Sequence, residues 1–204
     1  MSVYLLKSRF QSLLRPSVRV LHGLGVTANL VTLVACAISL ALGALLVWKP
    51  RAEFFLLIPV WMFLRMAFNA IDGMLAREFG QKSTLGAYLN ELTDVVSDAA
   101  LYAPFALVPG FSVASVAAVI FLSVLTEMTG VVAATTGATR RYDGPMGKSD
   151  RALAFGIVGL ALGCGYGMPA WADTAMWALA AMTAATVANR VRGGLREAAQ
   201  GGKG

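Results

Sequence analysis

The sequence predicts an all-α fold: an integral membrane bundle of six transmembrane helices, preceded by an N-terminal amphipathic interfacial helix. Apolar residues make up 57% of the 204 residues, and the mean hydropathy is +0.67. Only 14% of the residues are charged, whereas soluble domains carry about 25%. The apolar residues form long continuous runs rather than alternating with polar ones, which indicates membrane-crossing helices.

The interfacial helix is expected at residues 1–23. Apolar residues recur there at helical spacing, and they are punctuated by the basic residues Lys7, Arg9, Arg15 and Arg19. A helix of this kind lies on an anionic membrane surface with its apolar face buried. Pro16 is expected to bend or break it, because proline removes a helical hydrogen bond. A flexible basic tail is the alternative interpretation.

Six later apolar runs are expected to cross the membrane, where a helix rises about 1.5 Å per residue through ~30 Å of hydrocarbon. They are expected at residues 28–48, 54–77, 85–108, 113–137, 152–167 and 170–191. Residues 1–204 would then form a single membrane domain, with the six spans inside 28–191 and a basic, flexible tail at 192–204.

The distribution of basic residues predicts the orientation. Lys49 and Arg51 lie on one side of the bundle and Arg65 lies within a span, while the others of the 17 basic residues lie on the opposite side. Cytoplasmic loops carry the excess of Lys and Arg. We therefore expect a multi-pass protein of the inner or plasma membrane with both termini in the cytoplasm. This orientation explains the net charge of +6, so we expect no nucleic-acid partner.

Polar side chains, whose burial in a membrane costs free energy, gather in residues 69–98 on one face of each of two successive spans. Asn69 and Asp72 lie on the second span, and Asn90, Asp94 and Asp98 lie on the third at steps of four. A short connection makes these spans antiparallel, so the two faces can meet at the cytoplasmic end. Ionisable residues at membrane depth indicate functional sites, and oxygen ligands suit hard divalent cations. Helix packing is the alternative role for the small and amide residues.

The same stretch resembles a known family signature. It reads N-A-I-D-G-M-L-A-R and, after eight further residues, G-A-Y-L-N-E-L-T-D. This is similar to D-x-x-D-G-x-x-A-R-x8-G-x-x-x-D-x-x-x-D, the signature of the CDP-alcohol phosphotransferase (CDP-alcohol phosphatidyltransferase) family. The spacing matches throughout, with Asn69 and Asn90 in place of two aspartates. The six-span layout with an amphipathic N-terminal helix also resembles that family.

The resemblance implies an enzyme of phospholipid biosynthesis. Such an enzyme transfers a phosphatidyl or related phosphoalcohol group from a CDP-activated lipid, such as CDP-diacylglycerol, to a hydroxyl acceptor and releases CMP. The acceptor would be a small polar alcohol or phospho-alcohol. The resemblance also implies one or two Mg²⁺ or Mn²⁺ ions, a homodimer and a site that opens to the cytoplasm.

Carried over by position, the resemblance also assigns residues. The metal would be held by Asn69, Asp72, Asn90 and Asp94, and Asp94 would also act as the catalytic base. The nucleotide would be bound by Asn29, Thr32, Gly73, Ala76, Arg77, Ser83 and Gly86.

The two asparagines are a departure from the family pattern. Each keeps a carbonyl oxygen but removes one negative charge, so a single metal ion becomes an alternative to two. Glu91 and Asp98 are candidate compensating acids; alternatively, Glu91 pairs with Arg65 and Asp98 is a buried structural acid. Glu127, in the fourth span, is expected to pair with Arg65.

A basic patch is predicted between the fourth and fifth spans. Its members are Arg140, Arg141, Lys148 and Arg151. Cations there could clamp a phosphate group on the acceptor, or they could simply follow the positive-inside rule and bind lipid headgroups.

Two other functions remain as alternatives to the active enzyme. One is a catalytically weakened or inactive family member that binds lipid or nucleotide. The other is a small transporter, although such proteins often show inverted repeats that are not recognisable here.

Overall fold

The computed structural model describes residues 3–201, and it describes the side chains of residues 10–200. This part of the chain contains helices and no strand, so the all-α prediction is confirmed. The elements are α1 (Val3–Gly23), α2 (Ala28–Trp48), η1 (Ala52–Leu56), α3 (Leu57–Glu78), α4 (Thr84–Tyr102), η2 (Ala103–Leu107), α5 (Val113–Thr135), α6 (Lys148–Gly163) and α7 (Ala172–Gly201). Residues 202–204 of the expected tail, including Lys203, lie outside the described residues.

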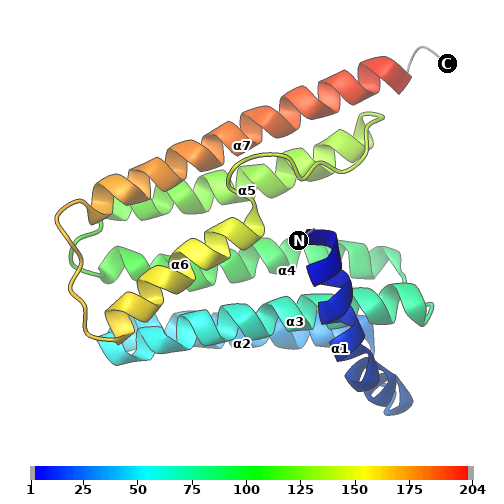
Figure 1. Cartoon of the computed structure of the whole chain (residues 1–204), viewed down its shortest axis with the longest axis horizontal. Helices are drawn as coiled ribbons and strands as arrows, with labels where there is room; N and C mark the ends of the chain where they lie inside the picture. Colours follow the sequence, from blue (N-terminus) through cyan, green and yellow to red (C-terminus); the bar gives the residue numbers. More distant parts are fainter. Residues whose placement is uncertain (1–2, 202–204) are drawn as a thin grey trace.

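The helices form an elongated bundle (Figure 1). Helix α2 packs against α3 and α4, α6 packs against α3, and α5 packs along α7. Helix α6 is inclined to the others, and α1 crosses α3 at one end. The α3–α4 connection, α1 and the C-terminal end of α7 lie toward that same end of the bundle.

Three helical stretches in the described range are long and apolar enough to cross a membrane. They are α2, the continuous stretch Ala52–Glu78 and α5. Large apolar side chains on the outer surface, such as Phe63, Phe121 and Leu153, are 59, 63 and 64% exposed, and hydrocarbon would cover such a surface. That the other three predicted spans also cross stays a prediction.

Several boundaries differ from those predicted. Helix α1 continues through Pro16 rather than breaking there. Helix α4 ends at Tyr102, and Pro104 lies in the 3₁₀ turn that follows it. Helix α6 begins at Lys148, before the apolar run, because the Asp150 side chain accepts a hydrogen bond from the Gly147 N–H at 2.9 Å and caps its first turn.

The basic C-terminal segment is helical rather than a flexible tail through Gly201. Glu197 fixes this end of α7, because its carboxylate accepts hydrogen bonds of 3.0 Å from both the backbone N–H and the hydroxyl of Thr139. The Leu, Arg, Glu and Ala residues of the segment also favour a helix.

An aromatic cluster closes the core below the polar end. The Tyr102 ring stacks on Phe155 with centroids 3.9 Å apart, and Phe105 contacts Phe155 edge-on. On the α2–α3 side, the indole N–H of Trp61 donates a buried hydrogen bond of 2.9 Å to Ser39. These contacts fix α4 relative to α6, and α2 relative to α3.

The close approach of α2 to α4 depends on Gly43. A Cβ atom at Gly43 would overlap the backbone carbonyl oxygen of Ala100. Gly43→Ala is therefore expected to destabilise the fold by about 1–3 kcal/mol, a usual cost of overpacking, and to lower the thermal midpoint in detergent. Gly156→Ala is the matched control, since its Cβ would lie 3.8 Å from Pro59. Equal midpoints for both variants would contradict this account.

Candidate functional site

A cavity of about 420 Å³ lies between α2, α3 and α4. All seven residues predicted to bind nucleotide line it: Asn29, Thr32, Gly73, Ala76, Arg77, Ser83 and Gly86. Asp72, Asn90 and Glu91 also line it, together with Gln81 and Lys82. The structure therefore brings together residues that are separated by more than fifty positions in the sequence.

Two helix N-termini open into this cavity, and the local sequence builds both of them. Thr27 caps α2 by accepting a hydrogen bond from the Leu30 N–H, and the Gln81 side chain accepts one from the Ala28 N–H at 2.7 Å. Ser83 caps α4 by accepting a hydrogen bond from the Gly86 N–H at 2.9 Å. Helix N-termini carry partial positive charge and favour phosphate groups.

Two glycines leave room in this cavity. A Cβ atom at Gly86 would lie 2.8 Å from Asn29 Oδ1, and one at Gly73 would lie 2.9 Å from a guanidinium nitrogen of Arg77. Glycine at these positions therefore lets Asn29 and the exposed Arg77 side chain fold over the helix backbone. A nucleotide could approach the backbone closely at the same points.

Asp72 is the buried acid of the cavity, with 5% of its surface exposed. The hydroxyl of Thr32 donates a hydrogen bond of 2.8 Å to its carboxylate. Within residues 10–200, no cationic side chain lies at ion-pair distance from Asp72. Its charge is therefore available to a cation supplied by a ligand.

A second hollow, a groove of about 500 Å³, lies between α3 and α6. Most of its wall is apolar: Pro59, Met62, Phe63, Met66, Ala152, Leu153, Gly156, Ile157 and Leu160. Polar residues line the end of the groove nearest the α3–α4 connection, and these are Arg65, Asn69, Lys148 and Ser149. Asn69 therefore lines this groove, whereas Asp72 and Asn90 line the cavity between α2, α3 and α4.

Asp94 contacts two cations. Its Oδ1 atom lies 3.1 Å from a guanidinium nitrogen of Arg65 and also contacts the ammonium group of Lys148. Arg65 further donates to the Asp94 backbone carbonyl at 3.1 Å and forms an ion pair with Asp98. In the described part of the chain, no hydrogen bond or ion pair involves the second carboxylate oxygen, Oδ2, of Asp94.

Glu127 is the centre of a buried ion cluster that joins α5, α6 and α7. Its carboxylate lies 3.1 Å from Arg151, 3.4 Å from Arg140 and 3.6 Å from Arg190. The Arg151 side chain is fully buried and also donates to the Thr126 hydroxyl at 3.0 Å. The expected pairing of Glu127 with Arg65 is wrong.

The two candidate compensating acids are both paired with protein cations. Asp98 is buried and contacts Arg65 and, at 3.6 Å, Arg151, which agrees with a structural acid. Glu91 pairs with Arg140 rather than with Arg65. Helical periodicity had shown which face each acid occupies, but not which helix packs against that face.

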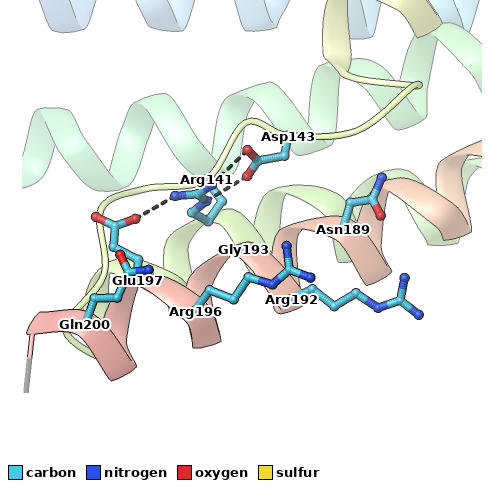
Figure 2. Close-up of a pocket in the computed structure, with 8 residues that line it drawn as sticks. All are labelled: Arg141, Asp143, Asn189, Arg192, Gly193, Arg196, Glu197 and Gln200. Atoms are coloured by element: carbon cyan, nitrogen blue, oxygen red, sulfur yellow. Dashed lines mark hydrogen bonds and ion pairs between the residues drawn. The ribbon is translucent and has the colours of Figure 1, made fainter.

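The four basic residues predicted as one acceptor-phosphate patch do not converge. Lys148 contacts Asp94, Arg140 and Arg151 contact Glu127, and Arg141 lies elsewhere. Arg141 is held between Asp143 and Glu197 at 2.7 and 2.6 Å, beside a separate hollow of about 600 Å³ that Arg192 and Arg196 also line (Figure 2). The Arg141 guanidinium holds the pKa of Asp143 below its usual range.

Sequence reasoning missed two contributors. Gln81 satisfies the first N–H of α2, and nothing in its local pattern indicates this long-range contact. Arg190 is 2% exposed and contacts Glu127 and the Thr126 carbonyl. Its sequence position predicted only one more basic residue at the cytoplasmic end, although its place at the end of an apolar run was the available signal.

Comparison with known proteins shows the family of the chain. The CDP-alcohol phosphatidyltransferase family matches residues 25–188. The chain belongs to this family. It is 46% identical to the inner membrane protein YnbA of Escherichia coli over 94% of this chain and 96% of YnbA. It is 32% identical to the phosphatidylinositol phosphate synthase of Corynebacterium glutamicum over 89% and 83% of the two chains.

Solved structures of the CDP-alcohol phosphatidyltransferase family share the fold. The phosphatidylinositol phosphate synthase of Mycobacterium tuberculosis with CDP-DAG bound superposes with a TM-score of 0.69, at 22% identity over 90% of this chain and 92% of that one. The same synthase in complex with manganese and citrate gives a TM-score of 0.68, at 22% identity over 88% of each chain.

The acidic side chains of the described residues are too dispersed to form a metal-binding cluster by themselves. Among residues 10–200, no group of three or more His, Cys, Asp and Glu side chains could hold a metal ion. Asp94 contacts two protein cations, and Asn69 lines the groove. Asp72 and Asn90 line the same cavity and would be the ligands of a bound ion there, since Mg²⁺ is often held by one or two carboxylates together with substrate phosphates.

Proposed function

We propose that this family member transfers a phosphatidyl group from CDP-diacylglycerol to the hydroxyl group of a small polar alcohol or phospho-alcohol and releases CMP. The observation that supports this most is the placement of two hollows on either side of α3. Asp72 and Gly73 line the polar cavity. Asn69 lines the apolar groove and lies about one turn of α3 before Asp72. A donor with a nucleotide at one end and acyl chains at the other fits this pair.

The dimensions of the groove support the acyl end of the donor. From Pro59 to Asn69, α3 rises by about 15 Å, which accommodates a large part of an acyl chain. The open side of the groove would face the bilayer, so the chain could enter from the membrane. The diphosphate group would then lie across α3 at the turn from Asn69 to Asp72.

In the proposed reaction, the acceptor oxygen bonds to the phosphorus that carries diacylglycerol. The bond between that phosphorus and the oxygen shared with CMP breaks, and CMP leaves with the electron pair. Asp94 takes the acceptor proton, and its free Oδ2 atom is suited to this step. When bound at Asp72 and Asn90, a Mg²⁺ or Mn²⁺ ion would neutralise charge on the diphosphate.

The acceptor and the cellular setting are part of the same proposal. Arg140 is the best-placed cation for an acceptor phosphate, because it contacts Glu91 at the edge of the cavity and its side chain is 27% exposed. The clustering of basic residues at this end favours a cytoplasmic site in the inner membrane. A homodimer is proposed from the family resemblance alone.

The proposal is tested by measuring nucleotide release. Purified protein with CDP-diacylglycerol, Mn²⁺ and a mixture of glycerol 3-phosphate, inositol phosphate and simple alcohols is expected to form CMP, and omission of every acceptor is expected to stop its formation. CDP binding without any CMP formation would instead favour a non-catalytic binding protein. The absence of both CDP binding and CMP release would contradict the proposal altogether.

A further inference from the structure

Lys148 occupies an unusual position between the two hollows. It is the first residue of α6, and its side chain lines the polar end of the groove together with Arg65 and Asn69. Its ammonium group contacts Asp94. Lys148 thus joins the lipid side of α3 to the acid expected to act as the base.

The Lys148 side chain is less constrained by its neighbours than the Arg65 side chain. Arg65 is 4% exposed and is fixed by Asp94, by Asp98 and by a backbone carbonyl. Lys148 has a side chain that is 26% exposed, and Asp94 is its one ion-pair partner among the described residues. A lysine ammonium is a compact charge on a flexible stem, so Lys148 can move onto a ligand while Arg65 stays with Asp94.

The charges around Asp94 also differ from what the family signature implies. Asn69 and Asn90 replace two of the four aspartates of the family signature, so less negative charge is available to hold cations. The charge of Asp94 is already met by the side chains of Lys148 and Arg65. A divalent ion at Asp94 would lie beside these two cations, and repulsion between like charges makes binding of a second ion unfavourable.

We propose that Lys148 is a built-in cation that replaces one divalent ion at Asp94 and binds the donor diphosphate from the groove side of α3. This inference rests on the proposed function, because it takes a CDP-linked lipid as the ligand. Lysine is a common ligand of phosphate groups. When its ammonium group moves to a phosphate oxygen, Asp94 loses one of its two contacts and is free to accept the acceptor proton.

The wild-type protein gives the first test. Titration with Mn²⁺, followed by electron paramagnetic resonance, is expected to show one tightly bound ion per chain. CDP is expected to bind in the presence of EDTA, since Lys148 supplies a cation without metal. Two tight Mn²⁺ ions per chain, or a complete requirement of CDP binding for metal, would overturn the proposal.

Substitutions give the second test. Lys148→Gln is expected to weaken metal-free CDP binding about tenfold or more and to strengthen Mn²⁺ binding by a similar factor, because Asp94 is released. Lys148→Arg keeps the charge and is expected to retain most of the metal-free binding. Lys49→Gln is the matched control, since Lys49 is exposed beside Trp48 in the connection after α2, away from the site.

The outcomes separate this inference from the proposed function. If Lys148→Gln binds both CDP in EDTA and Mn²⁺ as the wild type does, the inference is wrong whether or not CMP is formed. If the Lys148 variants behave as expected but the wild type never forms CMP from CDP-diacylglycerol, the proposed function fails and the assignment of Lys148 stands.

Discussion

Asp94→Asn is expected to lower the rate of CMP release from CDP-diacylglycerol by about 10²-fold or more, the usual contribution of a general base. The amide keeps the size of the side chain but cannot accept the acceptor proton. The fold is expected to persist, because Arg65 retains its ion pair with Asp98. The measurement is the initial rate of CMP formation, with circular dichroism to verify the helices.

The control for this prediction is the same substitution at Asp173. Asp173 accepts hydrogen bonds from the Ser112 N–H at 2.8 Å and from the Ser115 hydroxyl, in the first turns of α5 and α7. These turns lie at the other end of the bundle, so Asp173→Asn is expected to keep its turnover. An unchanged rate in Asp94→Asn would exclude Asp94 as the base.

Glu127→Gln is expected to cause the largest loss of stability. The change leaves Arg140, Arg151 and Arg190 without the carboxylate that they share, and Arg151 is fully buried. Removing one partner of a buried ion pair costs about 3–5 kcal/mol, since the remaining charge stays desolvated. The thermal midpoint of the purified protein in detergent measures this effect.

Glu53→Gln is the comparison for Glu127→Gln. Glu53 pairs with Arg51 at 3.0 Å, but both side chains are more than half exposed. An exposed pair of this kind contributes at most ~1 kcal/mol. If the two variants lowered the midpoint equally, the buried cluster would not have the structural role assigned to it.

The sequence predicted best those features that depend on short-range patterns. The bounds of the first predicted span agree with α2 (Ala28–Trp48), because an unbroken apolar run lies between the cap residue Thr27 and the pair Lys49 and Pro50. The nucleotide-binding residues proposed from the motif share one cavity. Motif spacing was sufficient there, because a short connection joins α3 to α4 and α2 packs against both of them.

The sequence could not predict contacts between distant helices. Periodicity placed Glu91 and Asp98 on faces of one helix, and Glu127 was assigned only to the fourth span. The partners of all three acids come from segments whose packing no local pattern reveals. The start of α6 was also missed, because an apolar criterion ignores the polar first turn that contains Lys148 and Arg151. That turn brings Lys148 to Asp94, so the same omission hid the ion pair on which the proposed role of Lys148 rests.

The most direct test of the central claim is the identity of the lipid product. Vesicles containing CDP-diacylglycerol with deuterated acyl chains would be incubated with the protein, Mn²⁺ and the panel of alcohols, and the lipids analysed by mass spectrometry. We expect a new phospholipid that carries the deuterated chains and one acceptor, formed in equal amount to CMP. Recovery of unchanged donor under all conditions, or of phosphatidic acid alone, would contradict the assignment of a phosphatidyltransferase.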